Sequence, residues 1–122
     1  MQVVIVEPKK KPMVQNIDDG LEAMQEIVGG TIQATYPFEE PIVLICNDEG
    51  KILNLPLNRA LRDSAGRVYD IVAGIFFLCA APADKDNFAS LTDEQAQTCL
   101  KYFAVPEQFI QVGDAVFVLP TL

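Results

Sequence analysis

The sequence predicts an α+β fold in which a mostly antiparallel sheet carries two helices packed on one face. Short runs of β-branched and aromatic residues recur along the chain, and turn residues separate them, as expected for strands. Two other segments have apolar residues at helical spacing. The 122 residues are enough for one domain with one core, so residues 1–122 are expected to fold as a single unit.

The strands are predicted from apolar runs that end at turn residues. In the first half of the chain these are segments 2–6, 31–36, 42–46 and 51–55. The turn at 47–50 ends in glycine and is expected to join the last two as a hairpin. Two further strands are expected over 68–80, where Gly74 suggests a bulge or a close approach of the backbone to another group, and over 109–119, with an interruption at Gly113. Segment 55–63 fits neither the helical nor the strand period.

The two helices are predicted from their ends as well as from their spacing. The first covers the apolar positions between Leu21 and Val28 and stops at Gly29, where a left-handed C-cap is expected. The second begins at Thr92, because Thr92 and Gln95 can form a capping box, and it ends before Pro106. Two inserted helices are too few for a doubly wound parallel sheet, so an antiparallel or mixed sheet is favoured.

The charge balance and the apolar segments limit the partners. Seventeen acidic residues against nine basic ones give a net charge of −8, which argues against a nucleic-acid polymer as the main partner. No segment reaches the roughly 18 consecutive apolar residues of a membrane span. The apolar run at residues 1–6 has no basic residues before it, unlike a secretory signal peptide. A cytoplasmic protein without membrane contact is therefore expected.

The absence of histidine limits the chemistry. A chain without histidine cannot form a Ser-His-Asp or Cys-His arrangement, and it lacks the spacings of zinc sites and of phosphate-binding glycine loops. Cys46, Cys79 and Cys99 lie among apolar residues and are expected to be buried and reduced. Carboxylate pairs such as Asp63 and Asp70 leave acid–base catalysis open, but nothing indicates that their pKa values differ. We therefore expect no enzyme, no catalytic residues, no metal and no cofactor.

One basic segment is a candidate for ligand binding. Arg59 and Arg62 are three residues apart and would project from the same side of a helical turn. Guanidinium groups bind phosphate oxygens with two hydrogen bonds, and Asn58 can hydrogen-bond a phosphate, a ribose or a base. The alternative interpretation is structural, with Arg62 paired to Asp63 or Asp70.

Aromatic residues supply the other half of the candidate site. Phe76 and Phe77 are adjacent in a predicted strand, so one ring is expected on each face, and one of them needs a helix, a second subunit or a flat ligand to cover it. Phe88 lies in an acidic loop next to Asn87, which could bind a ribose. For any single ring the hydrophobic core remains the simpler explanation.

Several segments together resemble a family of small uncharacterised bacterial, plasmid and phage proteins. The resemblance covers residues 1 to about 109, and its most specific parts are N-R-x-L-R-D at 58–63 and Y-D-I-x-x-G-x-F-F at 69–77. This family in turn resembles the first class of Thoeris anti-defence proteins. Those are phage-encoded sponges that sequester a cyclic ADP-ribose isomer made by a bacterial TIR-domain enzyme, and some also hold cyclic dinucleotides.

The resemblance implies a homo-oligomer that binds a cyclic nucleotide immune signal and leaves it intact. The ligand would contact Asn58, Arg59 and Arg62 through its phosphates, and Phe76, Phe77, Asn87 and Phe88 through its bases and riboses. Two other functions stay open. One is an acidic protein–protein antagonist, such as a DNA mimic that inhibits a restriction enzyme, and the other is an accessory protein of a mobile element.

Overall fold

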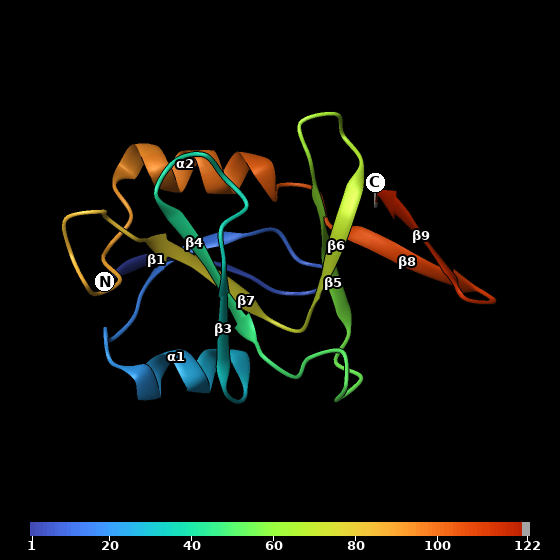
Figure 1. Ribbon diagram of the computed structural model, residues 1–122, viewed down its shortest axis with the longest axis horizontal. Coiled ribbons are helices and arrows are strands. Elements are labelled where there is room, and N and C mark those ends of the chain that lie inside the picture. Colours follow the sequence, from blue (N-terminus) through green and yellow to red (C-terminus); the bar gives the residue numbers. More distant parts are fainter. Residues whose placement is uncertain (121–122) are drawn as a thin grey trace.

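The computed structural model describes residues 1–120 and confirms the α+β class, with mostly antiparallel sheets (Figure 1). Every strand pair is antiparallel. The elements in chain order are β1 (Gln2–Val6), β2 (Met13–Asn16), α1 (Leu21–Val28), β3 (Ile32–Thr35), β4 (Ile42–Asn47), β5 (Leu57–Arg62), β6 (Val68–Ala73), β7 (Phe76–Ala80), α2 (Asp93–Tyr102), β8 (Glu107–Val112) and β9 (Ala115–Pro120).

The central sheet has five strands in the order β2-β1-β7-β4-β3. The two helices cover opposite faces of it, α2 above and α1 below in Figure 1, so the prediction that both pack on one face is wrong. Successive side chains of a strand alternate between faces. In β1, Val4 and Val6 therefore pack on the α2 side, whereas Val3 and Ile5 pack on the α1 side.

Each helix carries a short apolar stripe that fits one of these faces. Met24 and Val28 of α1 are buried, and Gly29 ends that helix in the left-handed conformation, as predicted. Ala96 and Cys99 of α2 are buried, and Thr92 and Gln95 make both hydrogen bonds of the predicted capping box. Because the sheet is covered on both sides, its middle strands β4 and β7 are apolar almost throughout.

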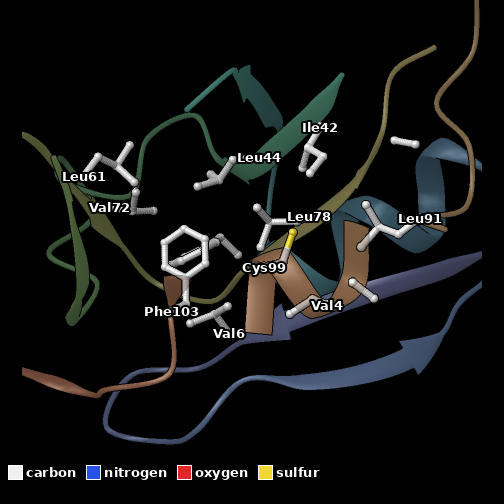
Figure 2. Packing of buried hydrophobic residues seen from close by; sticks show 13 residues of the cluster. Val4, Val6, Ile42, Leu44, Leu61, Val72, Leu78, Leu91, Cys99 and Phe103 are labelled. Carbon is white, nitrogen blue, oxygen red and sulfur yellow. The ribbon is translucent and has the colours of Figure 1, made fainter. Parts of the chain in front are cut away.

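The second sheet, β5-β6, closes over the α2 side of the core. Leu61 of β5 and Val72 of β6 join the same buried cluster as Phe103, at the end of α2 (Figure 2). Gly74 separates β6 from β7 and has φ of 85°. The apolar run 68–80 is therefore two strands in two sheets, rather than one strand with a bulge.

Three other segments differ from the prediction. Segment 51–55 forms turns instead of a strand, and Asn54 in it has a positive φ of 57°. Segment 55–63, which fitted neither period, contains β5 with shifts in register beside Leu57 and Leu61. The exposed edge strand β2 was missed, because its four residues bury no side chain and so show no apolar pattern.

The tail forms a separate hairpin, β8-β9, that projects from the body (Figure 1, right). Its turn lies at Gly113, where the sequence indicated an interruption. Within residues 1–120, no helix is both long and apolar enough to cross a bilayer.

Candidate functional site

Arg59, predicted to bind phosphate, lies in the interior with only 1% of its surface exposed. Its strand places the guanidinium beneath the end of α2. The Nη2 and Nε atoms donate to the Phe103 carbonyl oxygen at 3.2 and 3.3 Å, and Nη2 also donates to the Lys10 carbonyl oxygen at 2.6 Å. Burial lowers the pKa of Arg59, and the charge of Glu107 partly offsets this. Arg59 therefore joins the β1–β2 loop, β5 and α2, and offers nothing to a ligand in this conformation.

Three more residues of the predicted site are fully buried. Asn58 donates through Nδ2 to the carbonyl oxygens of Val6 and Gly74, both at 2.9 Å. Phe76 packs in the core on the α2 side and Phe77 in the core on the α1 side. One ring does lie on each face, as expected from the sequence, but a helix covers each of them.

Arg62 is the one predicted phosphate ligand that reaches the surface. It lies on β5, not on a helical turn, and its guanidinium is bound to the Glu107 carboxylate at 2.7 Å. That hydrogen bond is the largest cause that raises the pKa of Arg62. Arg62 thus has a structural partner, but the expected pairing with Asp63 or Asp70 is wrong: the partner is Glu107, while Asp63 accepts hydrogen bonds from its own turn and Asp70 pairs with Lys51.

Arg62 borders a surface groove of about 550 Å³ that we call the aromatic groove. This volume lies within the range of pockets that hold small ligands. Three loops and strands contribute to it: the turn after β3, the hairpin of β5 and β6, and the last residue of α2. Its lining residues are Tyr36, Pro37, Phe38, Glu39, Glu40, Arg62, Asp63, Ser64, Tyr69 and Tyr102.

The floor of the aromatic groove is fixed to the core by a chain of rings. Phe38 lies edge-on to Tyr102 at 5.0 Å between ring centroids, and Tyr102 lies edge-on to Phe103 at 4.8 Å. Phe103 in turn contacts buried Phe76 at 5.2 Å. The Tyr102 hydroxyl also lies within 3.4 Å of the backbone N and O of Arg62. These contacts hold the floor in place before any ligand arrives.

Two further tyrosines present free ring surface at the rim. Tyr36 and Tyr69 are 61% and 54% exposed. Burial of part of Tyr69, with smaller contributions from Tyr102 and Asp70, raises its pKa, so its hydroxyl stays protonated at neutral pH. The groove thus combines flat aromatic surfaces with hydroxyl groups that can donate hydrogen bonds.

Carboxylates outnumber cations along the groove. Glu39, Glu40 and Asp63 line it, whereas Arg62 is its only basic lining residue and is already paired with Glu107. Carboxylates accept hydrogen bonds from sugar hydroxyls and from amino groups. The carboxylates of the groove therefore favour parts of a ligand that carry hydroxyl or amino groups. An anionic group of the ligand is favoured only beside Arg62.

Asn87 and Phe88 lie elsewhere, in the loop between β7 and α2. They line a hollow of about 540 Å³ that also includes Met1, Asp19 and Lys85 and that shares no residue with the aromatic groove. The structure therefore divides the predicted site. Arg62 belongs to one surface, Asn87 and Phe88 to another, and the remaining four residues to the interior.

The residues predicted to contact a ligand include none of the tyrosines that line this groove, Tyr36, Tyr69 and Tyr102. The floor and rim of the groove come from positions near 36, 69 and 102, which only the fold brings together. Tyr69 opens the Y-D-I-x-x-G-x-F-F segment, but no motif joins it to positions 36 and 102. All three tyrosines of the chain border this one groove, which is apparent only from the structure.

A comparison with protein-family models matches residues 1–104 to a domain of unknown function, DUF3846. The chain belongs to the DUF3846 family. This confirms membership of an uncharacterised family and leaves the link to Thoeris anti-defence proteins as a prediction. All the lining residues of the aromatic groove lie within the DUF3846 match, whereas Glu107 and the β8-β9 hairpin lie beyond it. No match was found among curated proteins or solved structures.

Two further features bear on the chemistry. A cleft of about 310 Å³ between the sheets contains Cys46 and the Lys51–Asp70 pair, and burial raises the pKa of Cys46, so this thiol is a poor nucleophile. Within residues 1–120, no group of three or more Cys, Asp or Glu side chains is arranged to hold a metal ion.

Proposed function

We propose that this protein binds a small nucleotide in the aromatic groove and sequesters it without cleaving it. The observation that carries the proposal is the aromatic groove itself, in which Tyr36, Tyr69 and Tyr102 surround a space of about 550 Å³ with Arg62 at its side. On this proposal Asn58, Arg59, Phe76 and Phe77 support the groove from within instead of touching the ligand.

Stacking on tyrosine supplies the main attraction. A base that stacks on an aromatic side chain contributes about 1–3 kcal/mol, and every base has a face for it. The exposed rings of Tyr36 and Tyr69 can receive a base in this way. The glutamates Glu39 and Glu40 are positioned to accept hydrogen bonds from ribose hydroxyls.

The phosphate is expected beside Arg62. Its side chain keeps 39% of its surface exposed although it is bound to Glu107, so it can add a hydrogen bond to an anionic oxygen without leaving its partner. With three carboxylates nearby, a ligand that spreads its negative charge and offers large flat bases fits better than a compact polyphosphate.

The resemblance to Thoeris anti-defence proteins names the ligands to test first. It points to a cyclic ADP-ribose isomer, and then to cyclic dinucleotides, held in the cytoplasm of the host cell. A cyclic ADP-ribose isomer has one flat base, two riboses and a pyrophosphate, which corresponds to the rings, carboxylates and guanidinium of the groove.

The test is calorimetric titration of the protein with cyclic ADP-ribose isomers and cyclic dinucleotides. Tyr69→Ala should weaken binding by about 5- to 100-fold, through lost stacking. Val68→Ala, the neighbouring and exposed position that does not line the groove, is the matched control and should bind as the wild type does. Absence of binding for all these nucleotides would refute the proposal and favour the antagonist or accessory functions.

Arg62→Ala tests the phosphate contact, with Arg67→Ala as its control, since Arg67 is exposed and outside the groove. Arg62→Ala should weaken binding about tenfold or more and should lower the free energy of unfolding by about 1–3 kcal/mol or more, because the buried Glu107 carboxylate loses its charged partner. If the Arg62→Ala variant melts at a lower temperature but binds the nucleotide with unchanged affinity, Arg62 is not part of the binding site.

Sequestration without turnover has its own readout. Ligand recovered from the denatured complex should have the mass of the ligand supplied. If the molar amount of hydrolysed product exceeded the molar amount of protein, the protein would be an enzyme and not a sponge.

A further inference from the structure

The edge strand β2 directs part of its backbone away from the central sheet. Just beyond the β1-β2 ladder, Met1 and Ile17 exchange hydrogen bonds through their main-chain nitrogen and oxygen atoms. Hydrogen-bonded and non-bonded pairs alternate along an antiparallel ladder. The register therefore makes Gln15 part of a bonded pair, whereas the N–H and C=O groups of Val14 and Asn16 point away from β1.

No other segment of residues 1–120 pairs with this outward side of β2. Its one strand neighbour is β1, and no hydrogen bond reaches the outward backbone groups of Val14 and Asn16. Many natural edge strands are protected by a charged residue or a proline, but residues 13–16 contain neither. An open edge of this kind can accept an extended segment of another polypeptide as an additional strand.

A hollow of about 380 Å³ lies at the end of this edge, beside α1. Its lining residues are Asn16, Ile17, Asp18, Ala23, Glu26 and Ile27. Within residues 1–120, neither Asp18 nor Glu26 takes part in an ion pair. The hollow therefore combines an apolar wall with two carboxylates that have no basic partner in the described chain.

The charge around this hollow has one sign. Residues 12–50 contain eight acidic residues and no basic one, whereas the rest of the chain contains nine of each. The whole net charge of −8 thus belongs to the segment that includes β2 and α1. A cationic group is the complement of this surface, and its attraction adds to that of the open backbone edge.

We propose that β2 binds an extended segment of another protein, with a lysine or arginine of that segment in the hollow. The backbone of the added strand pairs with Val14 and Asn16. Its side chains point alternately to the two faces of the sheet, and the hollow begins at Asn16, within reach of one of them. The aliphatic stem of that basic side chain packs on the apolar wall, and its charged end meets Asp18 and Glu26.

A basic partner fits this surface better than a second copy of the chain does. The run of lysines at residues 9–11 lies in a bend, with Lys9 at a φ of 65° and the Lys10 carbonyl oxygen bonded to Arg59. A second copy therefore does not present these lysines as a strand. The surface also shares no residue with the aromatic groove, so the proposal does not depend on the proposed nucleotide.

The test is an NMR titration of the full chain with a short peptide of alternating threonine and valine that carries one central arginine. Peptide is added to about 2 mM, so that binding in the millimolar range is detected. The amide signals of Val14 and Asn16 should shift, and their hydrogen exchange should slow. The same peptide with glutamate in place of arginine should bind about tenfold more weakly, because it places a like charge beside the carboxylates.

Two pairs of variants test the backbone edge and the hollow separately. Val14→Pro removes an outward N–H and should weaken binding about threefold or more. Ala34→Pro, which removes an outward N–H at the opposite edge of the same sheet, is its control and should bind as the wild type does. Glu26→Gln should weaken binding of the arginine peptide to a similar extent, whereas Glu22→Gln, on the same helix but outside the hollow, should not.

A peptide N-methylated at alternate residues, which lacks the donors for β2, replaces the Val14→Pro test if that variant changes the circular dichroism spectrum. Its failure to bind is expected. Unshifted signals of Val14 and Asn16 at the highest peptide concentration would overturn the proposal, and so would equal affinities for the arginine and glutamate peptides. Amides that are already protected without peptide, in a protein that sediments at twice its 13.4 kDa, would assign the edge to a second copy instead.

Discussion

At the scale of single residues, the arginines illustrate how burial decides function. Arg59 and Arg62 are three apart in sequence, yet one ends beneath a helix and the other at a groove. The Phe103 carbonyl that Arg59 binds is at the C-terminal end of α2, where the helix dipole favours a positive charge. A residue with the chemistry of a phosphate ligand is thus used to hold the fold together.

Replacing Arg59 should therefore affect stability. Arg59→Lys leaves one compact ammonium group in place of a fork that serves the Lys10 and Phe103 carbonyls, so the free energy of unfolding should fall by about 2 kcal/mol or more. Urea unfolding followed by circular dichroism measures this. Arg67→Lys, at an exposed position, should leave the midpoint unchanged. An unchanged midpoint for Arg59→Lys would mean that the buried contacts contribute nothing.

The cysteines give a second residue-scale prediction. Burial raises the pKa of Cys79 and of Cys99 to about 12, from an ordinary value of 9.0. As the pH rises from about 9 to about 12, the unfolded chain loses these thiol protons while the folded chain keeps them, so the stability that they contribute is lost over that range.

At pH 8 a thiol reagent should therefore modify only half-buried Cys46 in the folded protein, and all three thiols in urea. Cys46→Ser should abolish the reaction in the folded state. Rapid modification of Cys79 without denaturant would contradict its burial.

The residues of the candidate site could be predicted only in part. The sequence identified Arg62 through its spacing of three residues from Arg59, although the segment is a strand and not the helical turn that this argument assumed. It could not show that Arg59 points inward, because the strand period is obscured by polar residues that the fold buries. Tyr69 and Tyr102 belong to the groove through tertiary contacts alone.

At the scale of elements, Gly74 controls the path between the two sheets. Its φ of 85° is in the region that favours glycine. A Cβ there would lie 2.8 Å from Leu55 Cδ1. The N–H of Gly74 donates to the Pro56 carbonyl oxygen, and the Gly74 carbonyl oxygen accepts from Asn58 Nδ2. The chain turns from β6 into β7 at a point where no other residue fits without a shift.

Gly74→Ala should lower the free energy of unfolding by more than Gly66→Ala does. Both positions have positive φ, so both substitutions cost about 1–2 kcal/mol in backbone strain. Gly66 has open space around it, whereas Gly74 must also displace Leu55. Thermal melting of the two variants gives the comparison, and equal losses would show that crowding at Leu55 is unimportant.

Most elements could be predicted where the local signal was strong. The capping box at Thr92 and the glycine at the end of α1 correctly predicted both helices, and apolar runs correctly predicted β1, β3 and β4. Segment 51–55 was predicted wrongly, because apolar alternation there serves a turn that packs Leu55 beside Gly74.

At the scale of the whole molecule, the helices themselves carry no sequence signal for the face of the sheet that each one covers. The stripe of an amphipathic helix looks the same whichever face of the sheet it covers. The helices cover opposite faces because β1, β4 and β7 have apolar side chains on both sides of the sheet. A sheet that is apolar on both faces requires a cover on each, and this could have been inferred from the continuous runs.

The net charge of −8 has a consequence for the folded state as a whole. Self-repulsion opposes compactness, and salt screens it over about 10 Å at 0.1 M. Raising sodium chloride from about 0.02 to about 0.3 M should therefore raise the melting temperature. A decrease would mean that the exposed ion pairs, such as Lys51–Asp70, outweigh the repulsion.

The strand order also determines how the chain can assemble in time. The pairs β1-β2 and β3-β4 are neighbours along the chain and can form hairpins early. Each remains half of a sheet until β7, which follows in sequence, enters between β1 and β4. Pairing between distant strands slows folding. During synthesis the two hairpins must therefore wait, with apolar edges open, until Phe76–Ala80 has left the ribosome, and this strand is the step at which folding and aggregation compete.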